Sequence, residues 1–326
     1  MDWNQLADRI LAGEEISRRE ALAVLQSTDE ELLAVLGAAH RVRHHHRGRQ
    51  VQLQLLHNGK SGLCTEDCAF CSQSALHRSP VARYPLHSVE QMVEGAQRSV
   101  QLGAATYCIV TSSRGPSARE LDQVCEAVRC LKRENPALQV CTSLGMLCAG
   151  QAEKLAAAGV DRYNHNLETS REFFAKIVTT HRYEDRLETL QRARVAGLQI
   201  CCGGILGLGE ELLDRVDLAF AIREQNAQAI PVNFLDPRPE TPLADRTTLS
   251  PLEGLRALAM FRLVNPDRDL RAAGGREACL RSLQPLALLV VNSIFVNGYL
   301  TTDGQGYDAD LGMIRDLGLE PTLAEG

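Results

Sequence analysis

The chain has 326 residues, of which 44% are hydrophobic and 23% are charged. This composition supplies enough apolar material for a large folded core and excludes an extensively disordered chain. The formal net charge of -6 and the pI near 5.9 argue against a nucleic-acid-binding protein, because such proteins need a basic surface to contact phosphates.

The sequence gives no indication of export or membrane insertion. A window of about 18 apolar residues does not occur, and the start, MDWNQLADRILAGEE, carries acids where a signal peptide is basic. We therefore expect a cytoplasmic protein without membrane contacts. Because cysteines stay reduced in that compartment, we expect metal or redox chemistry for some of the 11 cysteines.

The predicted elements begin with two helices, indicated by apolar residues at helical spacing within residues 4–46. The basic, His-rich segment at residues 40–49 could indicate metal or anion binding, but we interpret it as a solvated connector and assign it no function. From residue 51, short strand-like runs alternate with amphipathic helices, which is typical of βαβ units around a parallel sheet. The strand-like runs are 51–56, 106–111, 138–143, 162–167, 198–206, 229–235, 268–273 and 290–295.

Eight strands of this kind predict an α/β fold, a (β/α)8 TIM-type barrel over residues 49–318. An N-terminal helical extension, residues 1–48, precedes the barrel, and residues 319–326 are expected to form a frayed C-terminal tail. Capping-box spacing predicts helix starts at Ser88, Ser117 and Ser250, and left-handed glycines predict helix ends at Gly103, Gly159 and Gly197.

The sharpest motif is a C-x3-C-x2-C run, Cys64, Cys68 and Cys71, in the loop after the first predicted strand. Three thiolates at this spacing can hold three irons of a [4Fe-4S] cluster and leave the fourth iron open to a small molecule. The alternative is a structural zinc site, which needs a fourth ligand, and His77 is the nearest candidate. The ligand spacing favours the cluster.

With Phe70 before its last cysteine, this motif resembles the signature of the radical S-adenosylmethionine (SAM) superfamily, whose open iron binds SAM. From about residue 50 to residue 318 the sequence resembles the biotin synthases. The matching stretches are CTEDCAFCSQS (64–74), DRYNHNLETS (161–170), GGILGLGE (203–210), PVNFL (231–235), GGRE (274–277) and NSIFVNGYLTT (292–302).

The resemblance implies an enzyme that inserts sulfur into dethiobiotin to form biotin, the last step of biotin biosynthesis. It implies that SAM is reductively cleaved to methionine and a 5'-deoxyadenosyl radical, with reduced flavodoxin or ferredoxin as the electron donor. It also implies a homodimer.

A second set of candidate ligands lies on separate predicted strands. Cys108, Cys141 and Cys201 are on the second, third and fifth strands, and Arg271 is on the seventh. Because inward-facing residues converge on the axis of a closed barrel, these four could share one cluster; the alternative is that the cysteines pack as small apolar residues. The resemblance implies that they hold an auxiliary [2Fe-2S] cluster, the sulfur donor.

The nuclearity of that auxiliary cluster stays open from the residues alone. A fourth thiolate from Cys202 or Cys279 would suit a [4Fe-4S] cluster instead. Adjacent strand residues point to opposite faces, which argues against Cys202 joining Cys201.

Polar residues on the fourth predicted strand are candidates for ligand binding. Asn164, Asn166 and Glu168 alternate, so we expect all three side chains to face the cavity. The resemblance implies that Asn166 contacts both SAM and dethiobiotin, that Glu168 binds the SAM ribose, and that Asn164 contacts dethiobiotin.

Two later segments complete the predicted site. The glycine-rich run at 203–210 lacks the ordered spacing of a dinucleotide-binding loop. The resemblance implies instead that Gly203, Ile205 and Gly207 contact the adenosyl part of SAM, and that Asn233 binds the ureido ring of dethiobiotin.

Two other functions stay open. Another radical SAM barrel enzyme, such as a hydrogenase-maturation or methylornithine-forming enzyme, would need the first cluster but not the three strand cysteines. A non-enzymatic cluster or zinc carrier would not cleave SAM.

Overall fold

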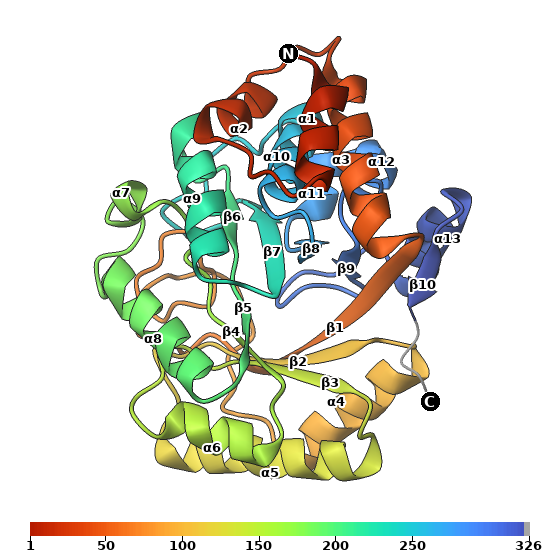
Figure 1. The fold of residues 1–326 in the computed structure, drawn as a ribbon. Helices are drawn as coiled ribbons and strands as arrows, with labels where there is room; N and C mark the ends of the chain where they lie inside the picture. The colour runs from red at the N-terminus through yellow and green to blue at the C-terminus, as the bar shows by residue number, and fades with distance from the viewer. Residues whose placement is uncertain (323–326) are drawn as a thin grey trace.

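The computed structural model describes residues 1–322 and confirms the predicted parallel barrel (Figure 1). All pairs between named strands are parallel, and the sheet closes because β1 pairs with both β2 and β9. The barrel strands are β1 (Gln50–Lys60), β2 (Thr106–Thr111), β3 (Gln139–Ser143), β4 (Arg162–Asn164), β5 (Gln199–Cys201), β6 (Gly204–Leu206), β7 (Ala229–Phe234), β8 (Asp269–Ala272) and β9 (Ser293–Phe295).

The fifth barrel position is shared by two short strands, which corrects the single strand predicted at 198–206. β5 pairs with β4, and both β5 and β6 pair with β7. At the break, a Cβ atom on Gly203 would lie 1.8 Å from the Pro231 carbonyl oxygen, so only glycine allows this close approach of two backbones.

The predicted fourth strand is also shorter than expected. β4 ends at Asn164, and Glu168 adopts a φ of 69°, a left-handed conformation that no regular strand contains. The backbone nitrogens of Leu167 and Glu168 both donate to the Gly203 carbonyl oxygen, at 2.9 and 3.3 Å. The chain therefore turns at the cavity rim and does not continue along the sheet.

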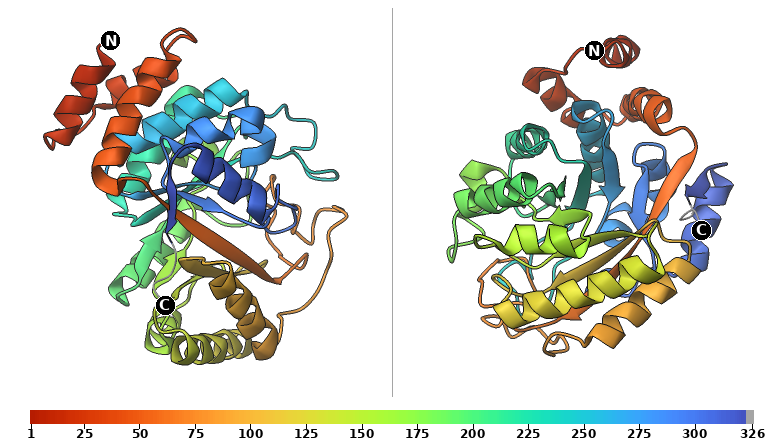
Figure 2. Two further views of the ribbon diagram at one scale, coloured as in Figure 1. Left: turned by 90° about the vertical axis from the view of Figure 1, so that its right-hand side faces the viewer. Right: turned by 60° about the horizontal axis from the view of Figure 1, so that its bottom comes forward.

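Helices surround the strands on the outside (Figure 2). They are α4 (Val89–Gln101), α5 (Ala118–Glu134), α6 (Gln151–Ala158), α7 (Arg171–Phe174), α8 (Tyr183–Val195), α9 (Leu212–Glu224), α10 (Pro251–Val264), α11 (Arg276–Leu280), the 3-10 helix η1 (Arg281–Leu283), α12 (Gln284–Leu288) and α13 (Tyr307–Asp316). The capping boxes predicted at Ser88, Ser117 and Ser250 are confirmed. The three glycines predicted to follow helix ends, Gly103, Gly159 and Gly197, all have positive φ.

Three N-terminal helices, not the two predicted, precede the barrel. They are α1 (Trp3–Leu11), α2 (Arg18–Leu25) and α3 (Leu32–Arg47). Figure 1 shows them at the top, where α2 and α3 pack against α10 and α2 also contacts α9. These helices extend the core on one side of the barrel.

The interpretation of residues 40–49 as a solvated connector is wrong, because most of this segment is the C-terminal half of α3. Arg43 is fully buried and donates to the carbonyl oxygens of Gly48, Gln50 and Val291. A buried guanidinium needs several acceptors, and the bend from α3 into β1 provides two of them.

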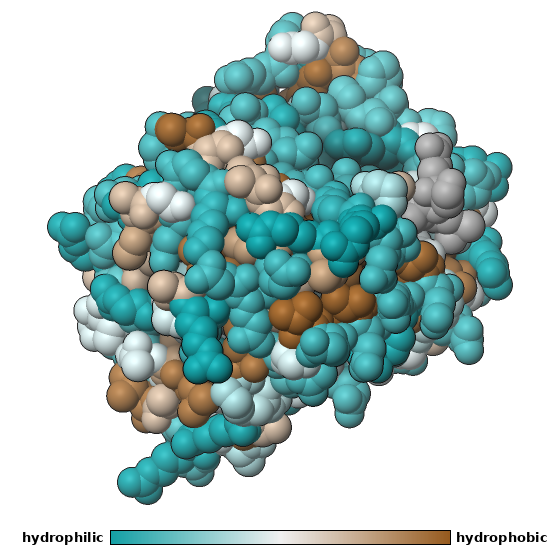
Figure 3. Space-filling view, turned by 90° about the horizontal axis from the view of Figure 1, so that it is seen from below, coloured by the Kyte–Doolittle hydropathy of each residue, from teal (hydrophilic) through white to brown (hydrophobic). Residues whose placement is uncertain are grey.

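The C-terminal tail is partly ordered. Glu320–Thr322 forms β10, which pairs with the start of β1, so these residues are not frayed; residues 323–326 lie outside the described residues. Within residues 1–322, the helices lack the length and apolar character needed to cross a bilayer. The surface seen from below, on the side where α4 to α6 lie, is mostly hydrophilic, with apolar residues in small separate areas (Figure 3).

Candidate active site

A cavity of about 320 Å³ lies at the carboxyl ends of the barrel strands, the end at which TIM-barrel enzymes carry their active sites. Its walls come from the loops that follow β1, β2, β3, β4, β7, β8 and β9. Both predicted sets of metal ligands line this one cavity: Cys64, Cys68, Cys71, Cys108, Cys141, Cys201 and Arg271.

The three-cysteine loop folds tightly over the mouth of the cavity. The Cys71 nitrogen donates to the Cys68 carbonyl oxygen at 2.9 Å, and the Ala75 nitrogen donates to the Cys64 carbonyl oxygen at 2.7 Å. Burial raises the pKa of all three thiols, that of Cys71 to about 11. Their thiolate forms therefore require a bound cation, which the iron of a cluster supplies.

The zinc alternative lacks its fourth ligand at this position. His77 does not line the cavity, and its Nδ1 contacts the Cys71 carbonyl oxygen at 2.8 Å. In the described residues 1–322, no three His, Cys, Asp or Glu side chains, those of the two cysteine sets included, lie close enough together to hold one metal ion. Three cysteine donors facing a cavity fit a cluster that keeps one metal position open to a ligand.

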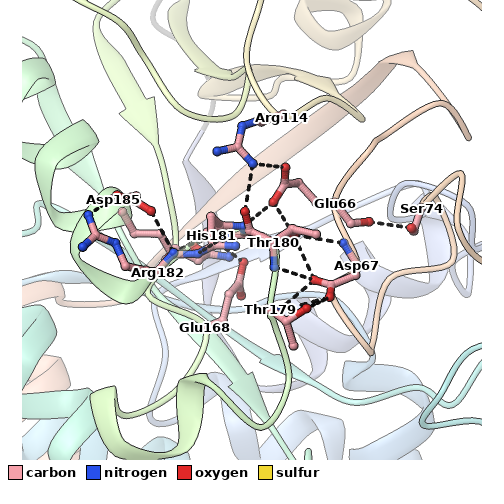
Figure 4. Close-up of polar contacts among 12 residues, drawn as sticks. Glu66, Asp67, Ser74, Arg114, Glu168, Thr179, Thr180, His181, Arg182 and Asp185 are labelled. Carbon is pink, nitrogen blue, oxygen red and sulfur yellow. Dashed lines mark hydrogen bonds and ion pairs between the residues drawn. The ribbon is translucent and has the colours of Figure 1, made fainter.

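Two acids inside the cysteine motif anchor the loop to residues 179–181 (Figure 4). Glu66 accepts hydrogen bonds from Arg114 at 2.7 Å, from Thr180 Oγ1 at 2.6 Å and from His181 Nδ1. Asp67 accepts from the backbone nitrogens of Thr179 and Thr180 at 3.0 and 3.2 Å. Burial opposes ionisation of Asp67, but hydrogen bonds from the hydroxyls and backbone nitrogens of Thr179 and Thr180 lower its pKa to about 2.

From His181 the network continues to the cavity wall through Arg186 on α8. Arg186 Nε donates to His181 Nε2 at 3.1 Å, so His181 is neutral and its Nδ1 carries the proton that faces Glu66. Burial of the imidazole lowers the pKa of His181, which agrees with the neutral state. Arg186 Nη1 then donates to the Asn166 carbonyl oxygen at 2.8 Å and lies 3.4 Å from Glu168 Oε1.

Sequence reasoning missed Arg186, although it lines the cavity beside the cysteine loop. Arginines are frequent along α8, and no spacing in the sequence distinguishes the one that is buried. Burial raises the pKa of Glu168 while the Arg186 charge lowers it, so the arginine favours the ionised carboxylate at the cavity wall.

The second set of ligands lies on the inward faces of separate barrel strands. Cys108 on β2 pairs in register with Cys141 on β3, and Asn164 Nδ2 lies 3.1 Å from Cys201 Sγ. All three cysteines are buried. Hydrogen bonding to Cys141 lowers the pKa of Cys108 and Cys201, the latter to about 6, while the same hydrogen bonds raise the pKa of Cys141 well above its usual value. The thiolate form is therefore favoured at Cys108 and Cys201 but not at Cys141.

The two other cysteines considered for the auxiliary site lie elsewhere. Cys202 is buried in the main core, as the alternation of strand residues predicts. Cys279 on α11 lies against α10, with its Sγ 3.9 Å from the Ser250 carbonyl oxygen. Neither lines the cavity, so neither adds a fourth thiolate to the strand cysteines in this structure.

The polar wall contains most of the predicted SAM and substrate ligands. Asn164, Asn166, Glu168, Ile205 and Asn233 line the cavity, but Gly203 and Gly207 do not. Gly203 does not reach the cavity because it lies against the Pro231 carbonyl group on β7. The expected strict alternation does not hold either: the residue between the two asparagines, His165, also lines the cavity because β4 has already ended.

Several buried polar atoms around the cavity have no hydrogen-bond partner among residues 1–322. They are Gln73 Oε1, Ser112 Oγ, His165 Nε2 and Glu168 Oε2. Buried polar atoms normally have a partner, so this wall fits a polar ligand. The Asn233 amide differs: its Nδ2 donates to the Gly204 carbonyl oxygen at 3.1 Å and its Oδ1 accepts from the Gly274 nitrogen at 2.9 Å.

A three-cysteine loop over the open end of a parallel barrel, facing a polar cavity, defines an enzyme of the radical SAM class. Two family models match the chain: one described as the Radical SAM superfamily over residues 60–221, and one described as the Biotin and Thiamin Synthesis associated domain over residues 231–320.

Relatives that match nearly the whole chain identify the family within this class. The chain is 54% identical to the biotin synthase of Salinibacter ruber (strain DSM 13855 / M31) over 99% of the chain and 90% of the relative. It is 47% identical to the biotin synthase of Bacillus subtilis (strain 168) over 99% of the chain and 96% of the relative. The chain therefore belongs to the biotin synthase family.

Solved structures agree with the fold. A methylornithine synthase (PylB) superposes with a TM-score of 0.85 over 97% of both chains at 19% identity. HydG, a maturase of the [FeFe]-hydrogenase, superposes with a TM-score of 0.84 over 98% of this chain and 75% of HydG at 16% identity. At these identities the likeness concerns the fold alone.

Proposed function

We propose that the protein converts dethiobiotin to biotin, with a [4Fe-4S] cluster on Cys64, Cys68 and Cys71 and an auxiliary [2Fe-2S] cluster on Cys108, Cys141, Cys201 and Arg271. The observation that carries the proposal is that both ligand sets line one cavity with polar side chains between them. When bound, the first cluster supplies the electron that cleaves SAM to methionine and a 5'-deoxyadenosyl radical, and the second supplies sulfur.

The residues of the wall bind and orient the two small molecules. Glu168 offers the unpartnered Oε2 to the hydroxyls of the SAM ribose, and Ile205 adds an apolar surface for the adenosyl group. Asn166 Oδ1 accepts from the Gly203 nitrogen at 3.1 Å, which leaves the Asn166 amide nitrogen to donate to SAM and dethiobiotin. Gly203 thus acts through Asn166 rather than by direct contact.

Dethiobiotin is proposed to lie deeper, between Asn164 and Asn233. Because the side-chain amide of Asn233 already bonds to backbone on both sides, its orientation is fixed before the ureido ring binds. Apolar lining from Leu56, Val110 and Phe295 excludes water from the carbons to which sulfur is added.

The test uses the full chain, reconstituted with iron and sulfide without oxygen. It is expected to hold about six irons, four in one cluster and two in the other, and to form biotin from dethiobiotin, SAM and reduced flavodoxin, detected by mass spectrometry. SAM cleavage without biotin, together with about four irons per chain, would point instead to another radical SAM enzyme.

Other parts of the proposal rest on the family resemblance. We propose a cytoplasmic homodimer that is reduced by flavodoxin or ferredoxin. From the pattern of helices and strands we also propose three parts of the chain: a helical extension (1–48), the catalytic barrel (49–318) and a C-terminal tail (319–326), of which residues 320–322 pair with β1.

A Glu168→Gln protein is expected to bind SAM about tenfold more weakly or worse, because a hydrogen bond to a charged group contributes about 1.5–3 kcal/mol. Equilibrium dialysis with reconstituted protein and no reductant measures the Kd for SAM. The control is Glu172→Gln, which changes an exposed acid on α7 outside the cavity. An unchanged Kd in Glu168→Gln would remove the assigned ribose contact.

A further inference from the structure

Buried charges lie beside the strand cysteines in the sheet register, where Arg162 pairs with Cys141, and Asp269 pairs with Ala229, the partner of Cys201. Asp269 lies two residues before Arg271 on β8, so both side chains face the barrel interior. Arg162 reaches the same region from β4, where it pairs in register with Cys141. Asp269 is 5% exposed and Arg162 is 8% exposed, so neither charge is solvated by bulk water.

Asp269 is held on more than one side. Its Oδ2 accepts from Arg271 Nη2 at 2.9 Å and lies 3.9 Å from Arg162 Nη1, while its Oδ1 accepts from Asn292 Nδ2 at 3.1 Å. Asn292 is itself fixed, because its Oδ1 accepts from Arg262 Nη2 at 2.7 Å. The carboxylate therefore has a defined position and its negative charge lies between two guanidinium groups.

Two contacts hold the guanidinium group of Arg271 in place. Arg271 Nε donates to Ser293 Oγ at 3.0 Å and Nη2 donates to Asp269. Within residues 1–322 the Arg271 side chain makes no hydrogen bond through its other amino nitrogen, Nη1, and its Cζ lies 5.0 Å from the centre of the Phe295 ring. Arg271 lines the cavity together with the cysteines. A guanidinium is planar and rigid, so fixing two of its nitrogens also fixes the direction of the third.

We infer that Asp269 is a positioning residue, which holds Arg271 with one amino nitrogen toward Cys108, Cys141 and Cys201. The inference rests on the proposed function, since it concerns the residues assigned to the auxiliary cluster. Side chains that orient a metal ligand contribute substantially to metal retention, and their loss typically costs about 10–100-fold in metal affinity or activity. In addition, removing the carboxylate leaves Arg162 and Arg271 in one buried region without the negative charge between them.

The experiment compares Asp269→Asn with unmodified protein, both full length and reconstituted without oxygen. Asparagine has nearly the same volume as aspartate but no charge. Mössbauer and visible absorption spectra distinguish the two clusters, and loss of the auxiliary signal is followed over time with an iron chelator. We expect an altered auxiliary spectrum and about tenfold faster loss to the chelator, with the [4Fe-4S] content unchanged.

Further variants make the test specific. Asp267→Asn removes an acid that is two residues away, with a side chain 54% exposed and paired with Arg268, and it should behave as unmodified protein. Ser293→Ala removes the acceptor of Arg271 Nε without changing a charge, so it should produce a smaller change in the auxiliary spectrum. Should Asp269→Asn fail to fold, Asn292→Ala tests the same role, because it removes the donor to Asp269 Oδ1 and keeps the carboxylate, and it should also alter the auxiliary spectrum.

The outcomes separate this inference from the proposed function. Unmodified protein with no second cluster would overturn the proposed function. Unmodified protein with both clusters, but with identical auxiliary spectra and chelator kinetics in folded Asp269→Asn and Ser293→Ala, would overturn the positioning role of Asp269.

Discussion

Cys64→Ala protein is expected to hold no [4Fe-4S] cluster and to leave SAM intact. The cysteine loop supplies three thiolates to the cavity, and a cluster that already keeps one metal position open cannot lose another protein ligand and stay bound. We expect the iron attributed to this cluster, about four atoms per chain, to disappear, and methionine and 5'-deoxyadenosine to fall below detection. Iron analysis and chromatography of the products measure both effects.

The matched control for this loss is Cys148→Ala. Cys148 is an exposed free cysteine before α6 and does not line the cavity. Its substitution should leave iron content and SAM cleavage unchanged. A Cys64→Ala protein that still cleaved SAM at a normal rate would contradict the assignment of the loop as the cluster site.

The second large effect is expected from Cys201→Ala, which should lose the auxiliary cluster and all biotin formation. Cys201 is the thiol beside Asn164 on the inward face of β5. Because the loop cysteines are untouched, the [4Fe-4S] content should stay normal, and SAM cleavage should continue without biotin as a product. Mössbauer spectra measure the content of each cluster, and a biotin assay on the same sample measures product formation.

The neighbouring residue provides an unusually close comparison. Cys202 is equally buried but lies in the main core, so Cys202→Ala should keep both clusters and lower stability by about 1 kcal/mol, a typical cost of a point substitution. A thermal unfolding curve and the biotin assay test it. Equal loss of biotin formation in both variants would show that Cys201 and Cys202 do not lie on opposite sides of the barrel wall as described.

Local patterns in the sequence predicted much of the fold. Alternating strand-like and helical runs gave eight barrel strands, and β2 has the bounds that the pattern predicted. The serine capping boxes were also found where predicted. These features depend on residues a few positions apart, so their cause is contained in a short segment.

The cysteine motif is a feature of the same kind, because its spacing alone allows three thiols to reach one cluster. The strand cysteines needed one further step, the convergence of inward-facing positions in a closed barrel. Both sets indeed line one cavity.

Interactions between distant segments were not predictable in this way. The link from Glu66 through His181 to Arg186 joins residues more than 100 positions apart, and no periodicity indicates it. The burial of Arg43 and the pairing of β10 with β1 have the same origin, because each depends on a partner that the fold brings near.

Spacing and alternation along the chain thus sufficed to indicate a barrel, a cluster-binding loop and a row of inward-facing thiols. Contact between β7 and the segment that follows β5 decided that Gly203 faces a backbone instead of the cavity. Closure of the barrel brought Asp269 on β8 near Arg162 on β4 and Arg271. The physical reason is that secondary structure follows from short-range preferences of the backbone. Which buried charges meet depends on how the sheet closes, and closure involves the whole chain.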